Sequence, residues 1–203
     1  MRLLRVLFVA FAAMISIAMA QTVPKTVHQD AFSIVGIQVR TTGEAEVTDE
    51  GVIPALWQRF YSEHILDKIP EKADQSVYAV YTDYSRDRMG GYTVVIGAKV
   101  TGQPQVPAGL VLKAIPAGDY AVVPSEIGPP SSVIPTAWQK VWALEDKDLL
   151  GGKRAYKADY ELYSSSSTDP QKAQADLYVG LKNTAPKQKP PTKGGFRISD
   201  ASS

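Results

Sequence analysis

The chain has 203 residues, of which 44% are hydrophobic, with 22 basic and 21 acidic side chains and no cysteine. The lack of cysteine excludes disulfides, thiol catalysis and thiolate metal sites. The near-neutral charge is not clustered, so the sequence offers no electrostatic surface for nucleic acid. A chain of this length can hold one compact domain whose apolar core is large enough to fold without disulfides or metals.

The first 20 residues have the pattern of a secretory signal peptide. Arg2 and Arg5 form a basic start, residues 6–13 are apolar, and Ala18-Met19-Ala20 is a small-x-small cleavage motif. We expect cleavage before Gln21 and export to the periplasm or the medium, without stable membrane insertion, because the apolar stretch is short for a membrane span. An uncleaved N-terminal anchor is the alternative. Removing two of the 22 basic residues leaves 20 against 21 acidic ones in the mature chain.

Composition divides the mature chain into three parts. We expect residues 21–31 to be an N-terminal extension and residues 32–182 to form the folded domain. Residues 183–203 are rich in proline, glycine, lysine and small polar residues and hold little to bury, so we expect a disordered tail. The tail raises the alternative that the protein binds a partner in the cell envelope, although the sequence identifies no such partner.

Hydrophobic periodicity and turn residues predict the order strand, helix, strand, strand, which then repeats. The first half, about 32–102, holds a strand over 32–42, a helix from Ile53 to near Pro70 capped by Thr48 or Asp49, and strands over 76–84 and 92–100. The second half, about 110–182, holds a strand region over 110–123 broken at Pro116, a helix over 133–144 capped by Ser132, and strands over 157–163 and 175–182.

The two halves also match residue by residue. Ile53-Pro54-Ala55-Leu56-Trp57 matches Ile134-Pro135-Thr136-Ala137-Trp138 at an offset of 81, and Tyr78-Ala79-Val80-Tyr81 lies over Tyr160-Glu161-Leu162-Tyr163 at 82. Val95 to Lys99 matches Tyr178 to Lys182 at 83. Ordered matches at a nearly constant offset indicate an internal duplication. The sequence therefore predicts an α+β fold of two βαββ halves related by a pseudo-two-fold axis. Its antiparallel strands form one sheet or two fused sheets, with two helices on one side and a central ligand pocket.

The strand over 157–163 carries the candidate site. Side chains alternate along a strand, so Asp159, Glu161 and Tyr163 share one face. The repeat places Glu161 over Ala79, and a purely structural sheet face gives no reason for an acid in only one half. A carboxylate buried among aromatic rings loses hydration, which raises its pKa unless a cation or a hydrogen-bond donor compensates.

Aromatic side chains are the expected surroundings of Glu161. The candidate ligand-binding residues are Glu161, Tyr163, Tyr81, Trp142, Tyr120 and Phe60. Tyr81 and Tyr163 are favoured because the repeat places them on the same strand face as Glu161. We expect Trp57 and Trp138 to pack the helices on the sheet, and Asp159 to be solvated near the start of its strand.

Several motifs follow one another in the order of a known family. They are Ile53-Pro54-x-x-Trp57, Tyr78-Ala79-Val80-Tyr81, Ile115-Pro116-Ala117-Gly118, Trp138-x-x-x-Trp142, Asp159-Tyr160-Glu161-x-Tyr163 and Ala175-Asp176-x-Tyr178. Together they resemble the GyrI-like small-molecule-binding domains, which also serve as effector-binding domains of AraC- and MerR-type multidrug regulators. The resemblance covers about residues 32–182. It implies a duplicated fold, a central pocket and a buried glutamate at Glu161 that attracts cationic aromatic compounds.

The resemblance also leaves an enzymatic alternative open, because some members of the family hydrolyse reactive cyclopropane-containing compounds. Glu161 would then activate water and Tyr163 would polarise the leaving group. The chain looks exported and shows no helix-turn-helix before Phe32, so we do not expect it to regulate transcription. His28 and His64 lack a second ligand motif, and no nucleotide-binding or hydrolase motif occurs. The sequence thus predicts a small-molecule-binding protein without cofactor or metal.

Overall fold

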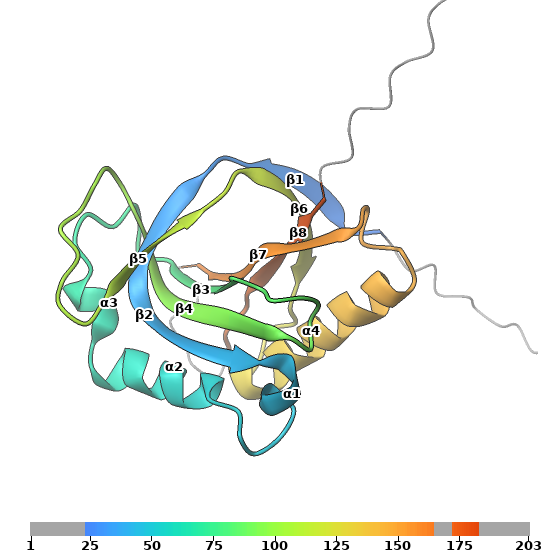
Figure 1. Ribbon diagram of the computed structural model, residues 1–203, viewed down its shortest axis with the longest axis horizontal. Helices are drawn as coiled ribbons and strands as arrows, with labels where there is room; N and C mark the ends of the chain where they lie inside the picture. The colour runs from blue at the N-terminus through green and yellow to red at the C-terminus, as the bar shows by residue number, and fades with distance from the viewer. Residues whose placement is uncertain (1–22, 165–171, 183–203) are drawn as a thin grey trace, which may run out of the picture.

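A computed structural model describes residues 23–164 and 172–182 (Figure 1). The predicted signal peptide and the predicted tail over 183–203 lie outside the described residues and stay predictions. Within the described part of the chain, no helix is long and apolar enough to cross a membrane.

The described residues form eight strands and four helices. The strands are β1 (Lys25–Gln29), β2 (Phe32–Thr42), β3 (Val77–Thr82), β4 (Gly91–Val100), β5 (Val111–Ile115), β6 (Gly118–Pro124), β7 (Arg154–Tyr163) and β8 (Asp176–Leu181). The helices are α1 (Gly43–Glu46), α2 (Ile53–Ser62), α3 (Ile65–Lys68) and α4 (Pro130–Asp146). They include the predicted strands and the two predicted helices in the expected order, together with β1, α1 and α3, which were not predicted as separate elements.

All the strands belong to one antiparallel sheet, in the order β1-β6-β8-β7-β3-β4-β2-β5. β1 and β2 follow each other along one bent stretch, and so do β5 and β6. The β1–β6 and β2–β5 ladders share one register: Val27 faces Tyr120, and five residues further on Phe32 faces Ile115. The two ends of the sheet therefore meet, and the sheet curls closed beneath β1 and β6 (Figure 1).

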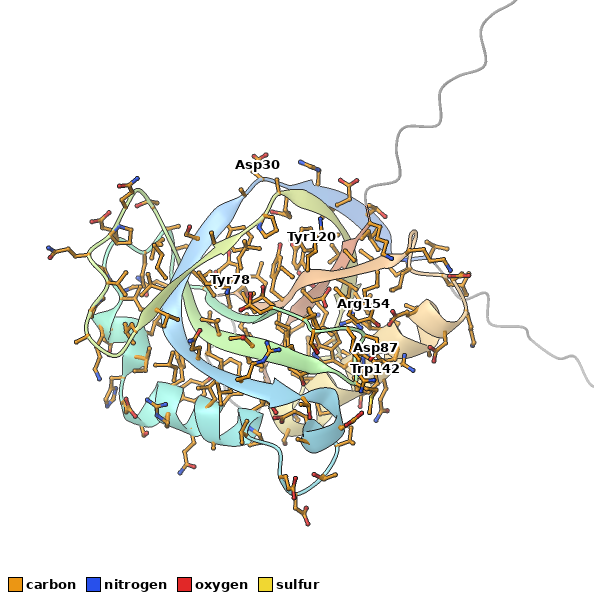
Figure 2. All side chains as sticks on the ribbon, in the orientation of Figure 1. Asp30, Tyr78, Asp87, Tyr120, Trp142 and Arg154 are labelled. Atoms are coloured by element: carbon orange, nitrogen blue, oxygen red, sulfur yellow. The ribbon has the colours of Figure 1, made fainter. Side chains whose placement is uncertain are left out.

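The curled sheet has an apolar layer on each face, because successive side chains alternate along every strand. The helix-side face packs against α2 and α4, with Leu56 and Phe60 from α2 and Trp138 and Val141 from α4 in its core. The inner face is filled by tyrosine rings together with aliphatic side chains. Its fully or nearly buried members are Ile34, Tyr78, Val80, Val95, Ile115, Tyr120, Ala158 and Tyr160. Figure 2 shows Tyr78 and Tyr120 inside the curl and Trp142 on α4.

The helix ends differ from the sequence-based expectations. Neither Thr48 nor Asp49 caps α2; the carboxylate of Glu46 accepts hydrogen bonds from the backbone N–H groups of Val52 (2.9 Å) and Ile53 (3.3 Å). A carboxylate at this end also suits the helix dipole. The helix predicted to reach Pro70 is interrupted at His64, whose φ of 51° ends the regular helix before α3 begins.

The second long helix also starts in an unexpected way. α4 begins at Pro130, and no side chain caps it, so the predicted Ser132 cap is wrong. The hydroxyl of Ser132 donates to the carbonyl of Pro129 instead, at 3.1 Å. Pro135, the repeat equivalent of Pro54 at the start of α2, lies inside α4 because this helix has extra residues before it.

The fold class is confirmed, but one domain boundary is wrong. Residues 21–31 were expected to be an extension, yet β1 pairs with β6 from Lys25 to Gln29. The folded domain therefore begins by Lys25. The sequence KTVHQ does not predict a strand, because Val27 is its only aliphatic residue. The segment is a strand because it pairs with β6.

Candidate functional site

Glu161 lies in the middle of β7 on the helix-side face of the sheet and is 1% exposed. Its Oε1 accepts hydrogen bonds from the Tyr81 hydroxyl (2.7 Å) and from Nε1 of Trp138 (2.7 Å). Its Oε2 accepts one from the Tyr163 hydroxyl (2.6 Å). Each of these donors is neutral, and none of the salt bridges between described residues includes Glu161. The carboxylate is thus buried with hydrogen bonds but without a counter-ion.

The electrostatics of this cluster follow from that arrangement. Burial raises the pKa of Glu161, and the hydrogen bonds from Trp138, Tyr163 and Tyr81 lower it only in part. Burial and the nearby Glu161 charge raise the pKa of Tyr81 well above its ordinary value, and they do the same for Tyr163. Both phenols therefore stay protonated and remain hydrogen-bond donors.

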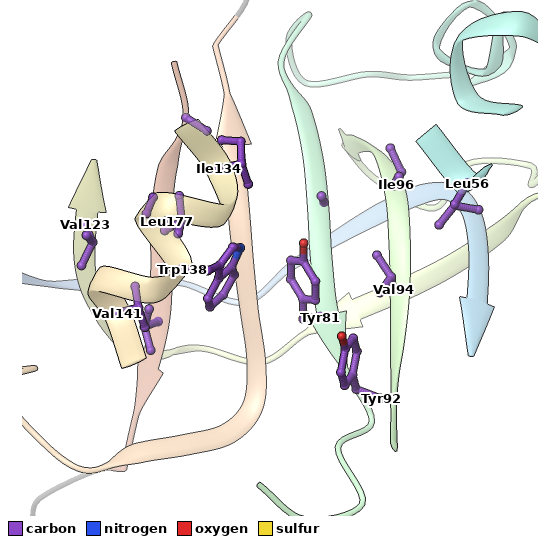
Figure 3. Close-up of a cluster of buried hydrophobic side chains, with 14 of the residues drawn as sticks. Leu56, Tyr81, Tyr92, Val94, Ile96, Val123, Ile134, Trp138, Val141 and Leu177 are labelled. Carbon is purple, nitrogen blue, oxygen red and sulfur yellow. The ribbon is translucent and has the colours of Figure 1, made fainter. Parts of the chain in front are cut away.

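The pseudo-two-fold symmetry explains the rings around the acid. The Tyr81 ring meets the Trp138 ring edge to face, with 5.1 Å between centroids, and Tyr163 meets Trp57 in the same way at 5.3 Å. The repeat makes these pairs equivalent, so each tyrosine packs against the tryptophan of the opposite half. Figure 3 shows Tyr81 and Trp138 turned toward each other. Glu161 lies between the pairs and faces Ala79 across the β3–β7 ladder.

Asp159 has a different environment from the one expected. It was predicted to be solvated, but it is fully buried and accepts two hydrogen bonds from Arg154, at 2.7 and 3.2 Å. The Tyr84 hydroxyl (2.7 Å) and the Gly180 backbone N–H (2.8 Å) also donate to it. The side chain of Arg154 is 3% exposed, so this is a buried, fully hydrogen-bonded ion pair. The negative charge of Asp159 is therefore compensated within the protein.

We call the rings around Glu161, those of Tyr81, Tyr163, Trp138 and Trp57, the aromatic cage. Arg154 contacts this cage at Trp138. Its guanidinium lies 4.5 Å from the Tyr156 ring centroid and 5.6 Å from that of Trp138. The Trp138 indole thus has a cation on its face and the Glu161 carboxylate at its N–H. Arg154 could not be predicted to lie here, because an irregularity in β7 between Arg154 and Asp159, with Tyr156 at a φ of 54°, breaks the alternation on which face predictions depend.

The structure brings together some of the predicted site residues and separates others. Tyr81 and Tyr163 donate directly to Glu161, whereas Phe60 borders the cluster only through Trp57, at 5.8 Å between ring centroids. The predicted position of Tyr120 is wrong: it lies on the inner face, against Tyr160 at 5.3 Å. Between β5 and β6 the chain bends, and the side-chain alternation shifts so that both Ile115 and Tyr120 point to the inner face. The sequence pattern did not reveal this shift.

The two tryptophans of α4 exchange the roles that we expected. Trp142 is half-buried and has Arg88 at 5.9 Å from its ring, on the side of the helix where Arg88 also pairs with Asp146. Trp138, expected to serve only packing, is the α4 residue that donates to Glu161. The equivalence of Trp57 with Trp138, and of Tyr81 with Tyr163, was a signal that would have found it.

The acid cluster is closed in this structure. One surface hollow of about 500 Å³ lies beside α1 and is lined by Glu44, Asp49 and neighbouring residues. Another, of about 260 Å³, lies beside Arg154 and Lys182. Glu161 lines neither of them, because Tyr81, Tyr163 and Trp138 cover it. The alternative catalytic roles of Glu161 and Tyr163 are tested by none of these contacts and stay a prediction.

A family model described as Cass2, integron-associated effector binding protein, matches residues 25–181. The chain belongs to the Cass2 family. The matched range begins at the first residue of β1 and ends at the last residue of β8, so the Cass2 domain coincides with the closed sheet and its helices.

A curated relative and a solved structure are similar to most of this chain. A Bacillus subtilis (strain 168) protein named "Putative transcriptional regulator protein YobU" is 30% identical over 156 residues, which cover 76% of this chain and 95% of that protein. The crystal structure of an integron cassette protein of Vibrio cholerae is 26% identical, covers 76% of this chain and 94% of its own, and has a TM-score of 0.59.

A more distant structure shows the same fold. The structure of SAV2435 bound to tetraphenylphosphonium is 14% identical, covers 78% of this chain and 93% of its own, and has a TM-score of 0.64. The similarity of this Cass2 chain to the GyrI-like effector-binding domains, inferred from its motifs, is thereby confirmed for the fold.

Proposed function

We propose that this protein binds a singly charged, aromatic organic cation. Glu161 is the counter-ion of the ligand, and Tyr81, Tyr163 and Trp138 form the walls of the site. The observation that supports this proposal most strongly is the buried carboxylate of Glu161, which holds three neutral donors and no cation. A ligand with a positive charge supplies the compensation that the protein itself does not.

The charge balance of the buried groups favours a single positive charge on the ligand. Among the described residues, the buried charged side chains are Arg154, Asp159 and Glu161. Arg154 pairs with Asp159 at 2.7 Å and also with the partly buried Glu145 at 3.3 Å, so Glu161 is the buried charge that is left without an internal partner. A dication would bring a second charge into a region of low dielectric constant with no partner for it.

The rings around Glu161 favour a lipophilic, delocalised cation. Tryptophan and tyrosine faces attract cations, and they provide apolar contact area for aromatic groups at the same time. The family to which the chain belongs is described as effector-binding. Tetraphenylphosphonium, found bound to SAV2435, is a permanent monocation with four aromatic rings and therefore has the chemistry that this site requires.

Because the cage is closed, a ligand has to replace part of the hydrogen bonding that now stabilises Glu161. Tyr163 and Trp57 are only partly buried, whereas Tyr81 and Trp138 are buried. The Tyr163–Trp57 pair is therefore the part of the cage that solvent reaches. Binding exchanges a donor to Glu161 for the positive charge of the ligand. Such an exchange weakens the apparent affinity by the free energy needed to open the cage.

Calorimetric titration with tetraphenylphosphonium tests the proposal. We expect saturable binding to the wild-type protein, and at least about tenfold weaker binding to Glu161→Gln, since that variant loses the counter-ion. The amide can still accept hydrogen bonds and removes a buried charge, so the unfolding free energy should stay unchanged or rise. The exposed Glu126→Gln is the matched control and should bind as the wild type does. Absence of binding, or equal affinity in Glu161→Gln, would overturn the proposal.

A further inference from the structure

A row of aromatic rings connects the surface of α2 with Glu161. Tyr61 is 65% exposed, and its ring stacks on Trp57 with 5.7 Å between centroids and an interplanar angle of 21°. Trp57 in turn meets Tyr163 edge to face at 5.3 Å. The hydroxyl of Tyr163 lies 2.6 Å from Oε2 of Glu161. Solvent and buried acid are thus joined by three rings in continuous contact.

The hydroxyl group at the outer end of this row also affects the one at the inner end. The pKa of Tyr163 is raised by burial, by the charge and the hydrogen bond of Glu161, and further by the phenol of Tyr61. A nearby carboxylate, Glu63, is paired with Arg59 at 2.9 Å across one turn of helix. It therefore provides no free charge that would compete with Glu161 for a ligand.

The position equivalent to Tyr61 in the second half has a cation against its ring. The offset of 81 that relates Trp57 to Trp138 also relates Tyr61 to Trp142. The guanidinium of Arg88, a residue of the first half, lies 5.9 Å from the centroid of the Trp142 ring in the second half and pairs with Asp146 at 3.0 Å. The protein's own cation thus occupies this aromatic position.

In the first half no internal cation takes that place. The cation–π contacts between described residues involve Arg88, Lys99 and Arg154, and none of them reaches Tyr61 or Trp57. The approach along α4 is therefore occupied by Arg88, whereas the approach along α2 ends in an exposed ring. The two halves therefore differ in two ways: one aromatic position holds Arg88 and the other does not, and the acid Glu161 occurs in one half alone.

We propose that Tyr61 and Trp57 form an outer binding subsite for aromatic cations, on the route to Glu161. The proposal rests on the proposed function and adds a location and an order of events. The cation first contacts the ring face of Tyr61 that is turned away from Trp57, and then moves inward past Tyr163. Because the outer contact precedes opening of the cage, it contributes to the association rate as well as to the affinity.

Stopped-flow fluorescence and calorimetry with tetraphenylphosphonium test the subsite, using Tyr61→Leu and Tyr61→Phe in the full chain. An exposed cation–π contact is worth about a two- to fivefold change in affinity. Tyr61→Leu should lose that factor, mainly through slower association, while Tyr61→Phe keeps the ring and should bind like the wild type. Ile127→Ala, which alters a side chain of similar exposure (66%) on another surface, should change neither value.

The outcomes separate this inference from the proposed function. If Tyr61→Leu binds with wild-type rate and affinity while Glu161→Gln loses binding, the outer subsite is wrong and the function of Glu161 stands. If Tyr61→Leu and Tyr61→Phe are equally impaired, the hydroxyl and not the ring matters, and the subsite is also wrong. Failure of the wild type to bind overturns both. Tyr61→Gln, whose helix propensity is close to that of leucine but whose side chain is polar, repeats the measurement in case the exposed apolar leucine perturbs the protein.

Discussion

At the scale of single residues, two acids two positions apart in β7 are stabilised by different means. Asp159 has a buried arginine, a phenol and a backbone N–H, whereas Glu161 has hydrogen bonds from neutral groups alone. The carboxylate of Asp159 is part of the structure, because its charge is compensated inside the protein. The carboxylate of Glu161 is left uncompensated, and this difference is the basis of the proposed binding site.

We predict that Arg154→Met lowers the unfolding free energy by about 3–5 kcal/mol, because it leaves Asp159 buried without its counter-ion. The double variant Arg154→Met with Asp159→Asn should regain a large part of this loss, since no buried charge is then left unpaired. Urea denaturation measures both values. A loss below about 1 kcal/mol in the single variant would mean that the ion pair is not the buried, rigid contact described above.

At the scale of elements, the backbones of the antiparallel neighbours β2 and β4 approach each other very closely at one point of their ladder. Gly36 lies opposite Gly97 in an uninterrupted ladder, so there is no bulge at this point. A Cβ on Gly36 would stand 2.1 Å from the carbonyl oxygen of Ile96, and one on Gly97 would stand 2.0 Å from that of Val35. Both glycines are required because the two backbones leave no room for a side chain.

We predict that Gly36→Ala and Gly97→Ala each destabilise the protein by about 2 kcal/mol or more, because the strands have to separate. Gly118→Ala in β6 is the matched control, since the nearest atom to its Cβ would be a ring carbon of Tyr120 at 3.9 Å. Thermal unfolding compares the three. Equal melting temperatures for Gly36→Ala and Gly118→Ala would contradict the close approach.

Elements were predicted where their own residues show hydrophobic periodicity, and they were missed where a distant segment stabilises them. The strand at 32–42 and the helix starting at Ile53 carry strong periodicity and were predicted at the observed start points. β1 was missed because it is a strand only by virtue of its partner β6. The cap of α2 was missed because Glu46 reaches it from a short helix that no local signal announced.

The site was predictable to the same limited extent. Glu161, Tyr81 and Tyr163 follow from alternation along a strand combined with the repeat. Tyr120 was misplaced because a bend between two strands changes the face of every side chain after it. Arg154 was not found because its partnership with Asp159 depends on an irregular stretch of β7. The predicted export also stays untested, since the first 22 residues lie outside the described part of the chain.

At the scale of the whole molecule, a duplicated domain departs from its own symmetry. Two equivalent tyrosine–tryptophan pairs remain, but one half alone supplies the acid, and Arg88 covers an aromatic ring in one half alone. The closed sheet holds these groups in place from both sides, with tyrosine and aliphatic side chains within the curl and the helices outside. A nearly symmetric scaffold thereby holds a single uncompensated acid, at Glu161.

The proposed role of Glu161, an uncompensated buried carboxylate that serves as the counter-ion of the ligand, makes binding depend on pH. The pKa of Glu161 in the free protein is raised above the ordinary value of 4.5, and a bound cation lowers it again. Between these two values, binding a permanent cation must release a proton. The affinity therefore falls as the pH falls through the raised pKa.

Calorimetry of tetraphenylphosphonium binding in buffers of different ionisation enthalpy, over roughly pH 4.5 to 8, measures this proton release directly. We predict that the wild-type protein releases up to one proton per bound cation at the acidic end of the range, and that Glu161→Gln releases none. Binding that is independent of pH and releases no proton in the wild-type protein would contradict the account.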